Sequence, residues 1–310
     1  MIRDLRKTDG PRVFGFLKTG FPEEERFLGT RPEGVQKIIQ RVFRWDTQLV
    51  LRLARLFGRP LFRFLVVEEG GTLVATTILS FTTRAGYVSM VMVDPAYRRR
   101  GHAQALLERA RVLSLAAGRK YIALDVLAQN TPARTLYERI GYRTLRESSF
   151  LVREPDAERT GGPSPALRPF RKEDARVLVT IARRAAAPEV EEVLPRSEAA
   201  LRGSSFENDI LQTESAAWVI DRGHGPEAYL GAAATAATAA GHVTDPIIGE
   251  GVEAADAAAL VRTAVDWCIA HGAPRIVVQA PAANVRGRAA LLGGGFHDAL
   301  ALWTLYRTTA

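Results

Sequence analysis

The 310-residue sequence contains a single cysteine, Cys268, so it cannot form an internal disulfide. No histidine or acidic residue accompanies it at the spacing of metal ligands; we expect no metal site and interpret Cys268 as a small buried apolar residue. An apolar run of the roughly 18 residues needed to span a bilayer is also lacking, and the first residues are charged where a secretory signal would be apolar. We therefore expect a cytoplasmic protein.

Length and composition indicate a folded protein of two domains. Hydrophobic residues make up 47% of the chain and charged residues 25%, which are ordinary values for globular proteins. The length exceeds the roughly 100–200 residues of a typical single domain.

Positive charge is concentrated in the first half. Residues 1–152 contain 26 Lys and Arg against 14 Asp and Glu, a net +12, whereas residues 153–310 contain 16 against 20, a net −4. The first half therefore favours an anionic partner. Charge alone does not choose among a nucleic acid, a membrane surface and a phosphorylated cofactor.

The second half repeats features of the first at a constant offset. Three residues recur 154 positions later: Gly118 as Gly272, Asn130 as Asn284 and Gly141 as Gly295. Between the two copies, residues 153–166 are rich in charge, glycine and proline, as in an exposed linker. This repeat predicts duplicated domains at 1–152 and 167–310, joined by the linker 153–166.

Apolar patterning in the first half predicts a sheet with helices. The pair Gly70-Gly71 separates two apolar runs as in a β-hairpin, and Asp94-Pro95 ends a third strand because proline cannot donate to a ladder. We predict an α/β (α+β) fold of two tandem domains, each a mixed, mostly antiparallel sheet flanked by helices. The expected elements are strands at 61–68, 73–79 and 87–93, a helix over 103–117, a strand at 121–127, a helix from Asn130 and strands within 142–152.

A basic turn lies where the third strand meets the helix. The first turn of a helix has free backbone N–H groups and a partial positive charge, and both favour a phosphate. Arg98, Arg99 and Arg100 add forked donors, while Gly101 and Ala103 lack bulk. The alternative is that this arginine run is only a solvated face.

Two motifs in the first half resemble those of the GNAT N-acetyltransferase superfamily. Val93, Pro95, Arg98, Gly101 and Ala103 match V-x-P followed by R/Q-x-x-G-x-G/A at the start of a helix. The stretch 130–142 resembles N-x-x-A-x-x-L-Y-x-x-x-G-F/Y. The resemblance covers most of residues 1–152 and implies an acyltransferase that uses acetyl-CoA (coenzyme A).

The resemblance also implies roles for individual residues. Backbone groups of Val91 and Val93 would bind the pantetheine arm, one N–H of that strand would polarise the thioester carbonyl, and Asn130 would contact the same arm. Tyr137 would lie near the sulfur as general acid, and it is the predicted catalytic residue. The predicted cofactor-binding residues are Val91, Met92, Val93, Arg98, Arg99, Arg100, Gly101, His102, Ala103 and Asn130.

The general base is not evident in the sequence. The third strand offers only Tyr87 and Ser89, so a water relay is plausible. An acidic run in a loop is more often solvated than catalytic. The available carboxylates are Glu23, Glu24, Glu25 and Glu68.

Residues 31–59 read as one or two arginine-rich amphipathic helices. By the resemblance they border the acceptor pocket; as alternatives they are core helices with a basic outer face, or they bind a membrane surface. Their expected apolar side consists of Val35, Ile38, Ile39, Val42, Trp45, Leu49, Leu53 and Leu56.

The second half lacks the features of the cofactor site. Glu250, Glu253 and Asp256 crowd its expected phosphate loop and would repel a pyrophosphate. We therefore expect this copy to keep the fold without carrying acetyl transfer. At the 154-residue offset, Arg98 becomes Val252, Gly101 becomes Ala255, Ala103 becomes Ala257 and Tyr137 becomes Leu291.

The leading hypothesis is an N-acetyltransferase that transfers an acetyl group to a primary amine of a small molecule or peptide, with one working site in the first half. The main alternative is an acyl-CoA-binding or sensing protein without turnover. A nucleic-acid binder is a more distant alternative, and we expect neither a nucleic-acid nor a membrane partner. The chain could be a monomer or a homodimer.

Overall fold

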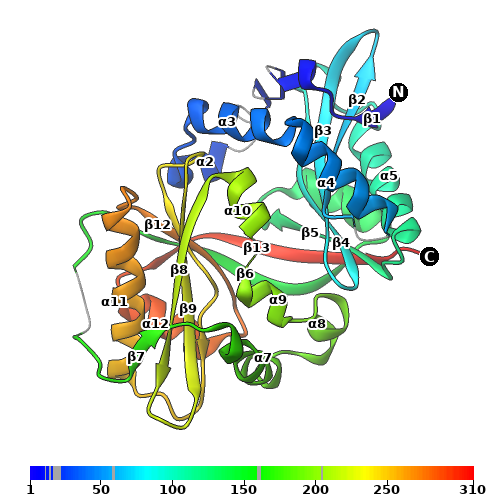
Figure 1. Ribbon diagram of the computed structural model, residues 1–310. Coiled ribbons are helices and arrows are strands. Elements are labelled where there is room, and N and C mark those ends of the chain that lie inside the picture. The colour runs from blue at the N-terminus through cyan, green and yellow to red at the C-terminus, as the bar shows by residue number, and fades with distance from the viewer. Residues whose placement is uncertain (11, 14, 17–21, 58–59, 159–161, 204) are drawn as a thin grey trace.

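The computed structural model describes the chain except for residues 11, 14, 17–21, 58–59, 159–161 and 204 (Figure 1). The first half contains β1 (Ile2–Asp4), α2 (Pro22–Leu28), α3 (Pro32–Val42), α4 (Trp45–Leu56), β2 (Phe62–Glu69), β3 (Thr72–Phe81), β4 (Ala85–Val93), α5 (His102–Ala116), β5 (Tyr121–Leu127), α6 (Thr131–Arg139) and β6 (Arg143–Arg153). The second half contains β7 (Leu167–Pro169), α7 (Ala175–Arg184), α8 (Pro188–Val193), α9 (Glu198–Arg202), α10 (Ser205–Leu211), β8 (Thr213–Asp221), β9 (Pro226–Thr235), β10 (Gly241–Val243), β11 (Ile247–Ile248), α11 (Ala254–Ala270), β12 (Ile276–Pro281), α12 (Val285–Gly293) and β13 (His297–Thr308).

The predicted fold class is confirmed, and the elements expected for the first half are present within a few residues of their predicted bounds. One detail differs: residues 143–153 form the single long strand β6 rather than several strands. β6 pairs with β13, a strand from the far end of the sequence, rather than with another strand of the first half.

One sheet runs through both halves, in the order β1-β2-β3-β4-β5-β13-β6-β12-β10-β9-β8-β7, with β11 paired to β9. The two halves exchange their last strands: β13 lies between β5 and β6, and β6 lies between β13 and β12. Figure 1 shows β13 crossing the centre of the molecule to end beside α5. Thr309 fixes this end, because its N–H donates to the Lys120 carbonyl at 2.9 Å. The domain bounds at 152 and 167 stay a prediction, since each half's part of this one sheet includes a strand from the other half.

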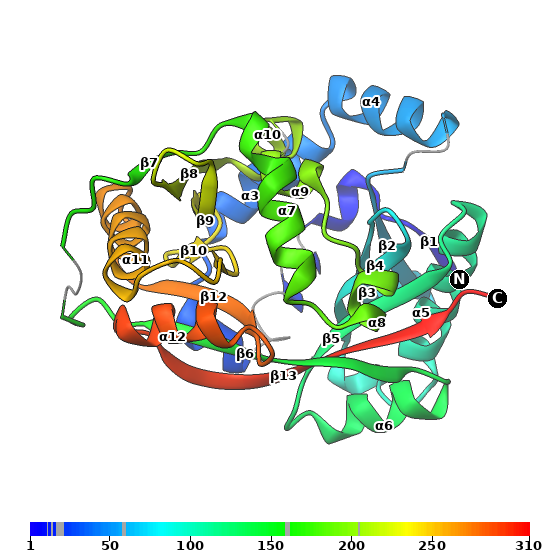
Figure 2. The same ribbon diagram turned by 90° about the horizontal axis from the view of Figure 1, so that it is seen from below.

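Helices cover both faces of this sheet. On one face α5 and α6 bury Leu106, Leu107 and Tyr137 against β3, β4 and β5, and α11 and α12 form the equivalent core of the second half. Cys268 is fully buried in that second core, as predicted. Figure 2 shows α7 and α8 on the opposite side of β13 from α6. No helix in the described part of the chain is both long and apolar enough to cross a membrane.

Local structure repeats between the halves as the sequence offset predicts. Arg3 in β1 pairs with Asp9 at 2.6 Å, and Arg168 in β7 pairs with Asp174 at 2.8 Å. Both aspartates also accept a backbone N–H bond of 2.7 Å from a residue three positions earlier. The glycines at the repeated positions adopt matching left-handed φ angles: 71° and 74° at Gly118 and Gly272, and 91° and 84° at Gly141 and Gly295.

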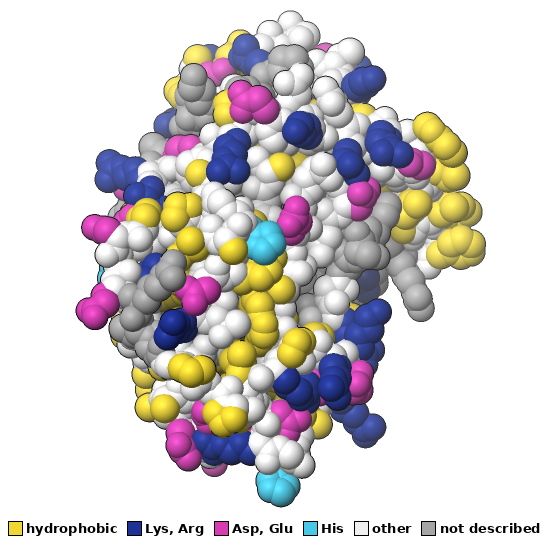
Figure 3. Space-filling model, turned by 60° about the vertical axis from the view of Figure 1, so that its left-hand side comes forward, with side chains coloured by type: hydrophobic (Ala, Val, Ile, Leu, Met, Phe, Trp, Pro, Cys, Tyr) yellow, Lys and Arg dark blue, Asp and Glu magenta, His cyan; other side chains and the backbone are white. Residues whose placement is uncertain are grey.

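The apolar side of α4 is exposed, contrary to a core or pocket-border role. Trp45 is 79% exposed and Leu56 77%, and Leu49 and Leu53 are also exposed. Figure 3 shows this group projecting at the right-hand edge of the molecule. In α3, by contrast, Val35 and Val42 are buried as predicted, because α3 packs beside the second-half loop around residue 237.

Candidate functional site

The predicted site lies at a fork between two parallel strands. β4 and β5 pair only from Ala85↔Tyr121 to Val88↔Leu124, and beyond this point they separate. β4 continues to Val93 paired with β3 alone, while β5 continues to Leu127 paired with β13. The edge of β4 from 89 to 93 therefore faces the fork without a strand partner and can bind an extended, amide-containing chain.

A β-bulge shapes this edge. The register with β3 shifts between Thr76 and Ile78, and Met90 has a φ of 56°, a left-handed value that is uncommon for a residue other than glycine. The Thr77 hydroxyl donates to the Ser89 carbonyl at 2.8 Å and supports the distortion. Bulges of this kind re-aim backbone groups beside functional sites.

The fork leads to the N-terminal end of α5. Gly101 is the N-cap with a φ of 83°, Arg99 has a φ of 64°, and the first turn of the helix contains no acidic residue. Ala103 lies in this first turn. Left-handed residues in such a turn direct successive N–H groups toward one point, and the helix end adds positive potential. This geometry suits a pyrophosphate.

The three arginines of the turn differ in their contacts. Arg100 pairs with Glu69 at 3.1 Å, and the same carboxylate lies 2.8 Å from Nε2 of His102. Arg98 and Arg99 have no ion-pair partner among the described residues. Two guanidinium groups are therefore available to a phosphate, and the alternative of a mere solvated face does not explain the strained turn that carries them.

Asn130 and Tyr137 border the fork through α6. Asn130 caps this helix by accepting the N–H of Ala133 through Oδ1, which leaves its exposed side-chain NH2 group available. Tyr137 is only 7% exposed, and its ring centroid lies 6.0 Å from that of Tyr142. Burial raises the pKa of Tyr137 to about 12, so the phenol keeps its proton at neutral pH. Its hydroxyl makes no hydrogen bond to other described residues.

A carboxylate that the sequence did not single out lies at the fork. Asp125 follows the last β5 residue that pairs with β4, and it faces away from α5 because its neighbours Leu124 and Val126 pack in the α5 core. Its carboxylate accepts hydrogen bonds from Thr304 (2.6 Å) and Gln279 (2.9 Å), both from the second half.

Two further groups contact the cluster formed by Asp125, Thr304 and Gln279. Burial, followed by the charge of Asp125 and a hydrogen bond to it, raises the pKa of Tyr87 well above its usual value. Nε of Arg146 donates to the Thr304 hydroxyl at 3.2 Å. Gln279 occupies the position 154 residues after Asp125, so the repeat brings two equivalent side chains into contact. These side chains meet only because the two halves exchange strands, so the sequence alone does not reveal their hydrogen bonds.

The carboxylates considered from the sequence are engaged elsewhere. Glu25 accepts both the N–H and the hydroxyl of Thr30, and Glu68 pairs with Arg3 at 2.7 Å. Glu23 lies 3.6 Å from Arg26, while the side chain of Glu24 is outside the described part of the structure. Asp125 is therefore a better candidate for the general base at the fork than Glu23, Glu25 or Glu68.

The corresponding fork of the second half is occupied by its own side chains. Here β10 and β12 pair in parallel only at Gly241↔Ile276 and His242↔Val277. Asn284 caps α12 as Asn130 caps α6, but its NH2 group donates to Asp245 at 2.6 Å and to the Pro246 carbonyl at 2.8 Å. The amide equivalent to that of Asn130 is thus already used.

The N-terminal end of α11 is also filled. Asp256 lies in its first turn, where it accepts hydrogen bonds from Ser164 (2.6 Å) and Arg222 (2.5 Å). Glu253, the N-cap, pairs with the same arginine at 3.1 Å. The expected crowding by acids is present, and their charge is satisfied within the protein.

A family comparison matches the part of the first half that contains this fork. Residues 30–142 match the model of the acetyltransferase (GNAT) family. This segment is therefore similar to GNAT domains, and the chain shares the fold of solved tandem GNAT proteins. GNAT domains support acyl-CoA-dependent N-acetyl transfer, and their acceptors are small molecules or peptides.

Solved structures share this architecture over the whole chain. A tandem GNAT protein from the clavulanic acid biosynthesis pathway aligns with 100% of this chain and 98% of its own, at 14% identity and a TM-score of 0.66. A GCN5-related N-acetyltransferase from Sphaerobacter thermophilus aligns with 100% of this chain and 95% of its own, at 15% identity and a TM-score of 0.63. At these identities the likeness establishes the fold.

Proposed function

We propose that the first half binds acetyl-CoA and transfers its acetyl group to a primary amine of a small molecule or peptide. The observation that carries this proposal is the open β4–β5 fork, which ends at an acid-free helix N-terminus with two available guanidinium groups. The equivalent fork of the second half has neither feature, so we assign the reaction to the first half alone.

Residues along the fork would hold the parts of acetyl-CoA in order. N–H groups around Gly101, with Arg98 and Arg99, would bind the pyrophosphate. Backbone groups of Val91 and Val93 and the amide of Asn130 would bind the pantetheine arm. Acetyl-CoA supplies the reactive thioester at the deep end of the fork.

Tyr137 and Asp125 would supply the proton transfers. Tyr137 holds a proton at neutral pH and would donate it to the departing thiolate. Asp125 accepts hydrogen bonds from Thr304 and Gln279, which hold its carboxylate in place; it would attract the acceptor ammonium and take a proton from it, directly or through one water. A backbone N–H at the bulge around Met90 would polarise the carbonyl.

Release of free thiol from acetyl-CoA across a panel of amines tests this function. We expect acceptor-dependent thiol release in the wild-type protein and a fall of at least ~100-fold in Asp125→Asn, the range of a positioned acid–base group. Binding of acetyl-CoA with no acceptor-dependent release by any amine would instead support the acyl-CoA-sensing alternative. Gln279→Leu removes one donor to the same carboxylate and should cost less than Asp125→Asn.

A further inference from the structure

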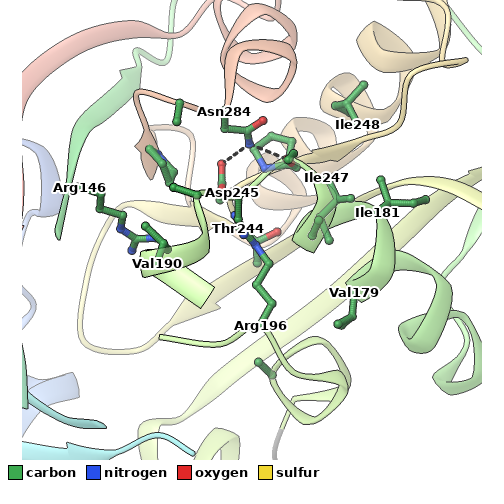
Figure 4. Close-up of a pocket in the computed structure, with 18 of the residues that line it drawn as sticks. Arg146, Val179, Ile181, Val190, Arg196, Thr244, Asp245, Ile247, Ile248 and Asn284 are labelled. Carbon is green, nitrogen blue, oxygen red and sulfur yellow. Dashed lines mark hydrogen bonds between the residues drawn. The ribbon is translucent and has the colours of Figure 1, made fainter. Parts of the chain in front are cut away.

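A cavity lies between the second half and strand β6 of the first half, and none of its lining residues has a role in the proposed transfer reaction. Its volume is about 510 Å³, within the range of small-molecule sites. The walls come from α7, α8, the loop after β10 and the loop between β12 and α12 (Figure 4). They are mostly apolar, with Val179, Ile181, Val190, Ile247 and Ile248 among them.

Four charged residues line this cavity: Arg146, Glu147, Arg196 and Asp245. Glu147 is exposed, and Arg196 pairs with Glu191 at 3.0 Å. Asp245 is half-buried, and its only hydrogen bond within the described structure comes from the amide of Asn284. Arg146 is also half-buried and uses only Nε, toward Thr304. Neither Asp245 nor Arg146 has an ion-pair partner among the described residues. Figure 4 shows the side chains of Arg146 and Arg196 extending from different segments toward the region of Asp245.

The charges in this cavity exclude several classes of ligand. Asp245 disfavours a simple anion, and Arg146 together with Arg196 disfavours a simple cation. Acetyl-CoA is excluded because the Asn284 amide is engaged and acids occupy the start of α11. Burial raises the pKa of Asp245 to about 6, and a bound cationic group would offset this cost.

We propose that this cavity binds a zwitterionic α-amino acid with a large apolar side chain. The ammonium group would contact Asp245, the carboxylate would contact the free N–H groups of Arg146, and the side chain would lie against Ile181 and Ile248. An ammonium and a carboxylate on one carbon match a cavity in which one carboxylate and one guanidinium have no ion-pair partner among the described residues. The proposal does not rest on the proposed reaction, and the two sites are connected only where Arg146 donates to Thr304, which donates to Asp125 at the fork.

Isothermal titration of the full chain with L-phenylalanine tests the proposal. We expect binding, and we expect at least 10-fold weaker binding of phenylalanine amide, which lacks the carboxylate, and of 3-phenylpropionate, which lacks the ammonium, because each loses a charge-assisted contact of ~1.5–3 kcal/mol. Absence of binding at ~10 mM, an affinity weaker than about −3 kcal/mol, would overturn the proposal. So would equal affinity for all three compounds.

Substitutions of Asp245 and Arg146 test whether L-phenylalanine binds in this cavity. Asp245→Asn and Arg146→Gln should each weaken L-phenylalanine binding at least 10-fold, whereas Arg146→Lys should retain part of it because it keeps the charge. Thermal melting checks that each variant folds. Gly101→Val, altered in the other half, should bind L-phenylalanine like the wild type. Unchanged binding in both Asp245→Asn and Arg146→Gln would show that the amino acid binds elsewhere, which contradicts the proposal.

Discussion

The β4–β5 fork and the β10–β12 fork are built from corresponding strands, yet they offer different surroundings to a ligand. At the first fork the capping Asn130 keeps a free amide and the following helix starts with Gly101 beside basic residues. At the second, Asn284 is hydrogen-bonded to Asp245, and Asp256 fills the helix start. Strand arrangement and N-cap are alike at both forks, so the difference between the forks lies in a few side chains rather than in the sheet.

The exchange of last strands makes each half part of the other half's region of the sheet. β13 completes the sheet beside β5, and Thr304 on it donates to Asp125. α8 adds a second contact, since Val190 and Val193 pack on Leu145 at the end of the first-half sheet. The second half therefore contributes both packing and polar contacts to the first.

The largest expected effect is a loss of kcat on changing Tyr137, a residue that the second half replaces with Leu291. Tyr137→Phe removes the proposed acid and should lower kcat ~100-fold or more, with the affinity for acetyl-CoA changed little. Stopped-assay thiol release and titration calorimetry measure the two quantities separately. Tyr142→Phe is the matched control, because its buried hydroxyl has no partner in the described structure and its loss should leave kcat unchanged. Equal effects of the two substitutions would remove Tyr137 from its role.

A substitution at the N-cap of α5 should act on binding rather than on chemistry. Gly101→Val places a β-branched residue at a φ of 83° and fills the space beside the free N–H groups; a cost of ~1–3 kcal/mol predicts ~5- to 150-fold weaker acetyl-CoA binding. Ala255→Val, at the repeated position, is exposed and should have no effect on this affinity. If Ala255→Val weakened binding as much, the assignment of the cofactor to one half would be wrong.

Much of this comparison could be predicted from sequence, because the motif around Gly101, the strands and the constant offset depend on local residue patterns. The strand exchange could not. β6 and β13 each satisfy the same alternating pattern whichever sheet they join, so nothing local distinguishes their partners. Asp125 was missed for the same reason: its donors Thr304 and Gln279 lie more than 150 positions away in the chain.

The exposure of the apolar side of α4 is a second feature that could not be predicted from the sequence. Helical periodicity correctly predicts the helix, but periodicity only indicates that one side is apolar and does not show whether another element covers it. Trp45 and Leu56 are largely exposed, although the pattern alone resembles that of a buried helix.

The halves should behave alike at their repeated ion pairs. Asp9→Asn and Asp174→Asn each remove a partly buried carboxylate held by an arginine and a backbone N–H, and each should lower the free energy of unfolding by about 1–3 kcal/mol. Arginine hydrogen bonds lower the pKa of both carboxylates. Their stabilisation is present above the unfolded pKa near 3.8 and is lost as pH falls through the lower folded value. Denaturant titrations at pH 7 and pH 3 check both points; a stability loss confined to one half would show that the pairs are not equivalent.

The smallest effect concerns the carboxylate inside the second fork. The pKa of Asp245 is raised from 3.8 to about 6 by burial, so the unfolded chain releases this proton first and stability falls as pH rises between about 4 and 6. Asp245→Asn removes that fall and keeps an oxygen to accept from Asn284; it should stabilise the ligand-free protein at pH 7.5 by about 1–2 kcal/mol and have little effect at pH 4. Urea titrations at both pH values measure this. Equal effects at pH 4 and pH 7.5 would mean that the charge of Asp245 carries no cost in the ligand-free fork, and that the two forks differ there in shape rather than in electrostatics.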